Sequence, residues 1–316
     1  MTARCYILLL VSMGAASPAA AQSWQPPPES QRCPSKWGAN DERGSGNHMK
    51  PDTVLRAARL MRTGEVFELG QVLSATMPFF GNRRFDVTLK RTLVNPEPNR
   101  RQSNEEIVYT ELGQVGTQID AFNHQTVGDS LYNCVKLNDV ATRTGFTKFG
   151  IDKVGMLMTR GVLLDVAALK GVEMLSDTYE ITVADLQGAM KRQNVTIAPG
   201  DAVLIRTGWS GLWGKDNARY VKTNPGVGVA AAEWLVKQDP MLVGADNWSV
   251  EVAPNPDPKL NLPGHQIMLP ISGVHLLENL NLADLAAKRV YEFALIVQPL
   301  KIQGATGSTV APVAIR

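Results

Sequence analysis

The segment from Gln114 to His124 gathers polar side chains in apolar surroundings, and it is the strongest candidate for chemistry. If residues 114–120 form a strand, alternation with period two places Gln114, Gln118 and Asp120 on one face. His124 follows within reach of a turn. Two amide oxygens, a carboxylate and an imidazole would then converge, and such a set suits a divalent cation or a polarised water molecule. A hydrogen-bonded polar strand edge without chemistry would show the same pattern.

The chain of 316 residues has only four histidines that could bind a metal or transfer a proton. They are His48, His124, His265 and His275. The net charge is +2, with 44% hydrophobic and 20% charged residues, so disorder and fibrous classes are excluded. Such a balanced charge predicts neither a nucleic-acid partner nor a membrane partner. The sequence contains no dinucleotide or P-loop glycine motif and no serine-hydrolase elbow.

The elements that must position the candidate residues alternate along the chain, which predicts an α/β fold and a single domain over residues 51–316. Hydrophobic spacing predicts helices over 51–63, 182–191, 229–238 and 282–288. It predicts strands over 66–73, 161–166, 202–207, 241–245, 293–300 and 307–315. Thr182 and Asp185 have the spacing of a capping box. The Arg-, Pro- and Asn-rich segment 78–104 is predicted to be strand and loop, with a lid as one interpretation.

The N-terminal residues 1–21 have a basic start, a short apolar run and an Ala-rich end. This pattern predicts a secretory signal peptide, hence export to the periplasm or secretion, with an uncleaved apolar anchor as the alternative. Residues 22–50 are predicted to be a lead-in that is Pro-rich and exposed over 22–34. Cys33 and Cys134 remain after cleavage, and the sequence leaves open whether they form a disulfide or two buried thiols.

The candidate segment resembles a known signature, H-x-G-T-H-x-D-x-x-x-H, of the metal-dependent cyclase family, which includes bacterial kynurenine formamidase and isatin hydrolase. Four of its positions match: Gly116, Thr117, Asp120 and His124. Gln114 and Gln118 stand where the family's two metal-binding histidines usually sit. The chain thus resembles a Gly-Thr-Gln variant of the signature.

Further motifs support the resemblance in order along residues 36–316. They are Trp37-Gly38 with Asp41, Gly44 and Asn47; Pro199-Gly200-Asp201 leading to Thr207-Gly208-Trp209; Gly244 to Glu251; His265 with Glu278; and Gly304 to Ser308. The resemblance implies a swivelling β/β/α fold, a homodimer or homotetramer, and a Zn²⁺ or Mn²⁺ cofactor. It also implies hydrolysis of a C–N bond in a small amide, formamide or lactam.

The resemblance assigns a role to each position. Asp120, His265 and Glu278 are expected to be metal ligands, and Gln114 and Gln118 occupy ligand positions. His124 is expected to be the general base toward a metal-activated water. Amide oxygens are weaker ligands than imidazole for late transition metals, so the two glutamines should tilt the site toward Mn²⁺, Mg²⁺ or Ca²⁺, or abolish the metal.

Several alternatives remain open at this stage. The runner-up enzyme is a metal-dependent lyase or cyclase, and a different class is a metal-free protein that binds a small molecule on the same fold. Trp248 and three other tryptophans could line a substrate pocket or pack in the core. Phe79 and Phe80 could form an aromatic gate or a hydrophobic anchor beneath the loop. The substrate itself is not readable.

Overall fold

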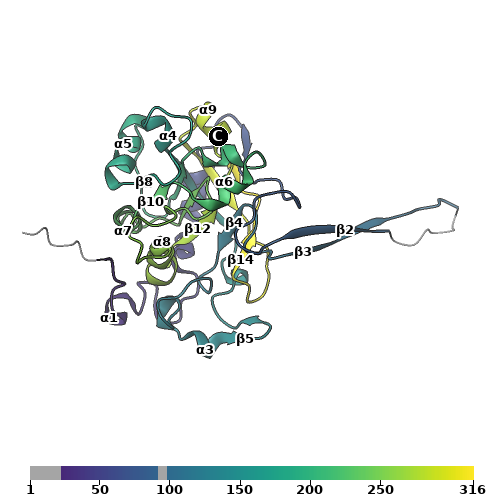
Figure 1. Cartoon of the computed structure of the whole chain (residues 1–316), viewed down its shortest axis with the longest axis horizontal. Coiled ribbons are helices and arrows are strands. Elements are labelled where there is room, and N and C mark those ends of the chain that lie inside the picture. Colours follow the sequence, from purple (N-terminus) through teal and green to yellow (C-terminus); the bar gives the residue numbers. More distant parts are fainter. Residues whose placement is uncertain (1–22, 92–97) are drawn as a thin grey trace, which may run out of the picture.

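The computed structural model describes residues 23–91 and 98–316, and the predicted signal peptide lies outside them (Figure 1). The helices are α1 Glu29–Arg32, α2 Pro51–Ala58, α3 Leu137–Val140, α4 Val166–Leu169, α5 Val183–Gln193, α6 Asn217–Lys222, α7 Val229–Lys237, α8 Pro263–Gln266 and α9 Ala283–Ala287. The strands are β1 Val66–Glu68, β2 Phe85–Arg91, β3 Asn104–Thr110, β4 Gln118–Asp120, β5 Ala141–Thr142, β6 Gly145–Phe146, β7 Leu157–Asp165, β8 Glu180–Ile181, β9 Ala202–Arg206, β10 Gly226–Val227, β11 Leu242–Ala245, β12 His275–Glu278, β13 Glu292–Val297, β14 Gly307–Thr309 and β15 Val313–Ile315. No helix within the described ranges is long and apolar enough to cross a membrane.

A nine-stranded mixed sheet organises the molecule, in the order β1-β15-β13-β7-β9-β11-β12-β4-β14. Its centre is parallel: β7, β9, β11 and β12 pair in succession. The flanks are antiparallel, with β13 on β7 and β4 on β12. β4, the strand of the candidate site, therefore lies between β12 and the edge strand β14.

The sheet is curled, because a short link joins strands near its two ends. β14 is one edge, and β15 lies beside the opposite edge strand β1. In a flat sheet their seven strand spacings would separate them by about 34 Å. The four peptide links from Thr309 to Val313 reach at most about 14 Å. The prediction of one strand over 307–315 is therefore wrong: it is two strands, which pair at distant places in the sheet order and draw its ends together.

Two hydrophobic cores lie on the two faces of the sheet. On β9, Val203 and Ile205 belong to the core that includes residues of α5 and α7. Ala202 and Leu204 alternate with them and point to the other face of the strand. They belong to the core that includes Leu285 of α9. Buried strands with apolar residues on both faces are expected in a parallel sheet covered on both sides. The predicted α/β fold and single domain are confirmed.

Most predicted elements are present, with shifted ends. α5 begins after Thr182, whose hydroxyl accepts a hydrogen bond from the Asp185 amide while the Asp185 carboxylate accepts one from the Thr182 amide, as predicted for a capping box. The helix expected over 51–63 ends at Ala58, and the strand expected over 66–73 ends at Glu68. Local spacing predicts the type of element better than its end, because tertiary pairing decides where it stops.

The segment predicted as strand and loop contains β2 and β3, which pair from Phe85 opposite Thr110 to Arg91 opposite Asn104. This hairpin projects from the body of the molecule (Figure 1). At its base, Phe85 is buried with Met77 and Val115, so the hairpin is rooted beside the candidate site.

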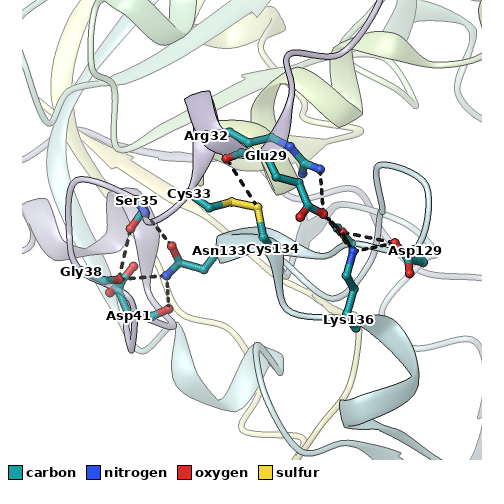
Figure 2. Close-up of a disulfide and its surroundings, with 11 residues drawn as sticks. Glu29, Arg32, Cys33, Ser35, Gly38, Asp41, Asp129, Asn133, Cys134 and Lys136 are labelled. Atoms are coloured by element: carbon teal, nitrogen blue, oxygen red, sulfur yellow. Dashed lines mark hydrogen bonds and ion pairs between the residues drawn. A yellow bond between two sulfur atoms is a disulfide. The ribbon is translucent and has the colours of Figure 1, made fainter.

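The lead-in is attached to the domain by a disulfide. Cys33 and Cys134 are bonded, with their Cα atoms 6.0 Å apart, which resolves the alternative left open by the sequence (Figure 2). Nearby, the Asn133 side chain accepts a hydrogen bond from the Ser35 amide and donates to the carbonyls of Gly38 and Asp41. The expectation of an exposed lead-in over 22–34 is only partly met, because half of the described residues there are half-buried. The Trp24 indole, for example, donates to Glu233 and packs partly against the core.

Candidate metal centre

The site is built on β4, which is shorter than predicted. Only Gln118–Asp120 is a strand; residues 114–117 are bends, so the expectation of one extended segment is wrong. Alternation still places Gln118 and Asp120 on the same face of β4. Both side chains are almost completely buried.

A turn, rather than strand alternation, brings Gln114 to this group. Gly116 has a φ of +65°, and a Cβ there would lie 2.1 Å from the Leu73 side chain. Only glycine fits this position without strain. The change of chain direction at Gly116 brings Gln114 back toward β4. Its side-chain nitrogen donates a hydrogen bond to the Asp120 carboxylate over 3.4 Å, and its side-chain oxygen accepts one from the Gln118 side chain over 3.4 Å.

Glu278 and His265 reach the site from different parts of the chain. Glu278 ends β12 directly opposite Gln118, and the Gln118 amide donates to its carboxylate over 2.9 Å. His265 lies on the short helix α8, and its Nε2 is 3.2 Å from Glu278 Oε1 and 3.9 Å from Asp120 Oδ2. The structure therefore brings together all six residues that the sequence singled out, namely Gln114, Gln118, Asp120, His124, His265 and Glu278.

Three of these residues could hold a cation together. One ligand atom from each of Asp120, His124 and His265 lies within 4.8 Å of the others. Ligands about 2.1 Å from a metal ion stand roughly 3–4 Å apart, so a small closure would complete such a site. Within the described residues, no hydrogen-bond partner reaches the buried atoms Asp120 Oδ2 and Gln118 Oε1. Unpaired buried oxygens are costly, and a cation would satisfy them, so the residues present fit a divalent metal.

The electrostatics of the site favour positive charge at the same place. Burial, together with the neighbouring Asp120 carboxylate, raises the pKa of Glu278 to about 7. Burial alone would lower the pKa of His265, but hydrogen bonds and charges from Glu251 and Glu278 outweigh it and raise that pKa well above its ordinary value. Glu278 and His265 thus tend to hold protons where a cation would bind, and a bound cation would displace these protons.

His124 differs from His265 in its surroundings. Burial lowers the pKa of His124, and the attraction of Asp120 offsets only part of that effect. Its Nε2 lies 3.2 Å from the Gln125 side-chain amide. An imidazole that stays neutral near pH 7 can accept a proton or bind a metal.

Sequence reasoning assigned no role to Glu251, which orients His265. Its carboxylate lies 2.6 Å from His265 Nδ1 and also accepts hydrogen bonds from the backbone amides of Gly264 and His265. This fixes the proton on Nδ1 and leaves Nε2 facing Asp120 and Glu278, as in carboxylate–histidine–metal arrangements. No spacing rule connects an acidic residue to a histidine that follows a long loop, so only the fold reveals the pair.

His275 supports the site from behind. It is fully buried, and its Nδ1 lies 3.1 Å from the Asp120 carbonyl oxygen. Its ring stacks on Phe122, and burial lowers its pKa to about 4, which keeps it neutral. A neutral His275 donates from Nδ1 and holds the backbone of β4 rather than a metal.

A small pocket lies on the glutamine side of the site, with a cavity volume of about 20 Å³, which is room for about one water molecule. Its wall includes Gln114, Gln118 and Glu278, and its outer side includes Phe80, Arg83 and Trp248. Of the tryptophans considered from the sequence, Trp209 is instead fully buried, and its indole donates to the Tyr220 carbonyl. Trp248 lies at the pocket and stacks on Phe80, with ring centroids 4.4 Å apart.

Comparisons with known proteins identify the family and the fold. The model of the putative cyclase family matches residues 67–252. A crystal structure described as a novel cyclase is 33% identical, with a TM-score of 0.83, and the match covers 92% of this chain and 99% of that one. A search of curated proteins gives no match.

More distant structures share the fold. Isatin hydrolase A from Ralstonia solanacearum is 21% identical with a TM-score of 0.56, over 80% of this chain and 92% of its own. An isatin hydrolase bound to the product analogue thioisatinate is 19% identical with a TM-score of 0.58, over 84% of this chain and 98% of its own. The family model and the 33% identical structure settle the relationship, so the chain belongs to the putative cyclase family.

Proposed function

We propose that the protein is a metal-dependent hydrolase that cleaves the C–N bond of a small amide, formamide or lactam. The observation that carries this proposal is the cluster of ligand atoms from Asp120, His124 and His265, all within 4.8 Å of one another in a buried setting. Glu278 adds a second carboxylate beside His265. When bound, a divalent cation supplies Lewis acidity, which polarises a carbonyl oxygen and makes water more acidic.

The surroundings of each residue indicate which role it would take in the reaction. Asp120, His265 and Glu278 would hold the cation, with Gln114 and Gln118 as neutral oxygen donors. Carboxylate and amide oxygens with a single imidazole favour Mn²⁺ over Zn²⁺. His124 would take a proton from the attacking water and return it to the leaving nitrogen. The side chains of Phe80 and Trp248, which line the pocket, would exclude bulk water from the site.

The substrate class is inferred from relatives that share the fold. Two of them are isatin hydrolases, and one of these is bound to the product analogue thioisatinate. Opening a lactam requires an activated water and a proton donor to the departing nitrogen, and the residues above could supply both. Phe80 and Trp248 line the small pocket beside Glu278, and their ring faces suit a planar substrate.

A second candidate is a metal-free protein that binds a small molecule. It is favoured by the hydrogen bond from the Gln118 amide to Glu278, since this bond turns the nitrogen, not the oxygen, of Gln118 toward the carboxylate. A histidine at position 118 would present a lone pair to the metal instead. This candidate predicts small-molecule binding without turnover.

Turnover and metal content together test the proposal. The purified protein would be assayed against aryl formamides, isatin and lactones, with added Mn²⁺ and with a chelator. We expect hydrolysis of at least one amide or lactam that the chelator abolishes and Mn²⁺ restores. Absence of turnover on the whole panel, with bound small molecule, would support the binding protein.

The role of His124 can be separated from that of a ligand. His124→Ala should abolish turnover while the protein still binds Mn²⁺, because a general base is not needed to hold the cation. Loss of Mn²⁺ in the same variant would instead make His124 a ligand, as its closeness to Asp120 and His265 allows.

We also propose export and self-association. The Cys33–Cys134 disulfide supports an oxidising compartment, where such bonds persist. Fractionation of the native host would locate the mature chain, and sedimentation would distinguish monomer, dimer and tetramer. A reduced protein in the cytosol would contradict export.

A further inference from the structure

A second, largely apolar pocket adjoins the pocket that is lined by Gln114, Gln118 and Glu278. It is lined by Trp248, Ala253, Pro254, Leu260 and Leu262, with polar groups at Lys222, Thr223, Asn255 and Asn261. The two pockets have only two lining residues in common, Phe80 and Trp248. The stacked rings of these residues therefore form the partition between the metal side and the apolar side.

The two halves of the partition differ in how firmly they are held. Trp248 lies between the buried residues Asn247 and Ser249, and its indole donates to the Thr223 carbonyl over 3.4 Å. Phe80 is 42% exposed. Its ring contacts Trp248 on one side, and the Arg83 guanidinium lies 5.7 Å from its centroid. Trp248 is thus the more firmly held of the two rings.

The backbone around Phe80 suits a local movement. Phe79 is packed against the buried cluster of Met77, Phe85 and Val115, so it anchors the loop. Gly81 has a φ of +68°, and a Cβ built there would meet nothing within 4 Å. A fixed residue before Phe80 and an open glycine after it allow the ring to swing without disturbing the cluster. Of the two interpretations of this aromatic pair, Phe79 fits the anchor and Phe80 the gate.

We infer that Phe80 is a specificity-determining residue, a movable partition whose displacement joins the two pockets so that the apolar one receives the substrate's non-reacting substituent. The inference rests on the proposed function for the chemistry of the reacting end. The apolar lining calls for an aryl or alkyl substituent. A ligand ring or chain that replaces Phe80 against Trp248 regains the contact that the opening breaks.

Binding to metal-free protein tests the inference without turnover. Isothermal titration calorimetry would compare benzamide, which carries no further substituent, with 4-butylbenzamide, whose chain must pass the partition. Phe80→Ala should raise the affinity for 4-butylbenzamide relative to benzamide at least about fivefold over the wild type, since the chain no longer displaces a ring. Phe80→Leu should shift the same ratio in the same direction by less.

The matched control is Leu55→Ala, which removes a similarly exposed apolar side chain from α2, outside both pockets. Its affinity ratio should equal that of the wild type. If Phe80→Ala and Phe80→Leu fold but leave the ratio within about twofold of the wild type, the partition does not control access and the inference is wrong. A failed hydrolysis screen would leave these binding ratios unaffected, so failure of the proposed function is distinguishable.

Discussion

The floor and the roof of the candidate site are built by different means. The floor consists of Asp120 on β4, Glu278 on β12 and His265 on α8, and all three are almost completely buried. The roof is the loop around Phe80, whose ring is 42% exposed and contacts Trp248. Two sheet strands and a short helix fix the groups that would perform chemistry, whereas a loop covers the space that would hold the substrate. Changes in the floor should therefore alter reactivity, and changes in the roof should alter selectivity.

The largest effect is expected at the centre of the floor. Asp120→Asn keeps the shape of the side chain but removes its charge, so metal affinity and turnover should fall by at least about 1000-fold. Metal analysis and kinetic assays would measure both. Asp86→Asn, an exposed aspartate on the β2–β3 hairpin, is the control and should behave as wild type. An Asp120→Asn protein with native activity would disprove the role of the floor.

A smaller effect is expected at Glu251, which orients His265 of the floor. Glu251→Gln weakens the hydrogen bond that orients His265 and should reduce Mn²⁺ affinity by about 10- to 100-fold, as for other residues that support metal ligands. Calorimetric titration with Mn²⁺ would measure it, with the far-ultraviolet spectrum as a control for folding. Unchanged affinity in a folded variant would mean that His265 needs no such support.

The identity of the metal can be changed at Gln118. Gln118→His replaces a neutral oxygen donor by an imidazole opposite Glu278, so Zn²⁺ affinity should rise by about tenfold and Mn²⁺ affinity should change less. Competition between the two ions at equilibrium gives the ratio directly. A ratio equal to that of the wild type would show that position 118 does not face the cation.

The last prediction concerns stability, where Phe122, which stacks on His275 behind the floor, and Phe80 of the roof should differ. Phe122 is buried between His275 and Tyr132, so Phe122→Ala should cost about 3–5 kcal/mol in the free energy of unfolding. Phe80→Ala removes an exposed ring stack and should cost about 0.5–1.5 kcal/mol. Urea denaturation of the two variants would decide. Equal costs would mean that the roof is as firmly packed as the floor.

The same contrast explains what could be predicted from sequence. The central strands and helices were predictable because burial imposes a hydrophobic pattern, a continuous apolar run in β9 and a helical period in α5. Four of the six site residues, Gln114, Gln118, Asp120 and His124, were predictable from their polar types and close spacing. His265 and Glu278 were predictable only through the family resemblance. Alternation alone misplaced Gln114, which arrives through the left-handed turn at Gly116 and not along a strand.

Contacts between distant segments were beyond sequence reasoning. Glu251 reaches His265 because the intervening loop folds back, and no local period records this. The division of 307–315 into β14 and β15 follows from the closure of the curled sheet, which depends on strand order. The partition between the two pockets depends on side chains from two loops, Phe80 and Trp248, that have no fixed spacing.

The central claim is that the floor of the site holds a divalent cation despite Gln114 and Gln118. Elemental analysis of the natively purified protein, beside Asp120→Asn prepared in the same way, tests it most directly. We predict about one equivalent of Mn²⁺ or Zn²⁺ per wild-type chain and only traces in the variant. Trace metal in both proteins, unchanged after incubation with Mn²⁺ or Zn²⁺, would contradict the claim.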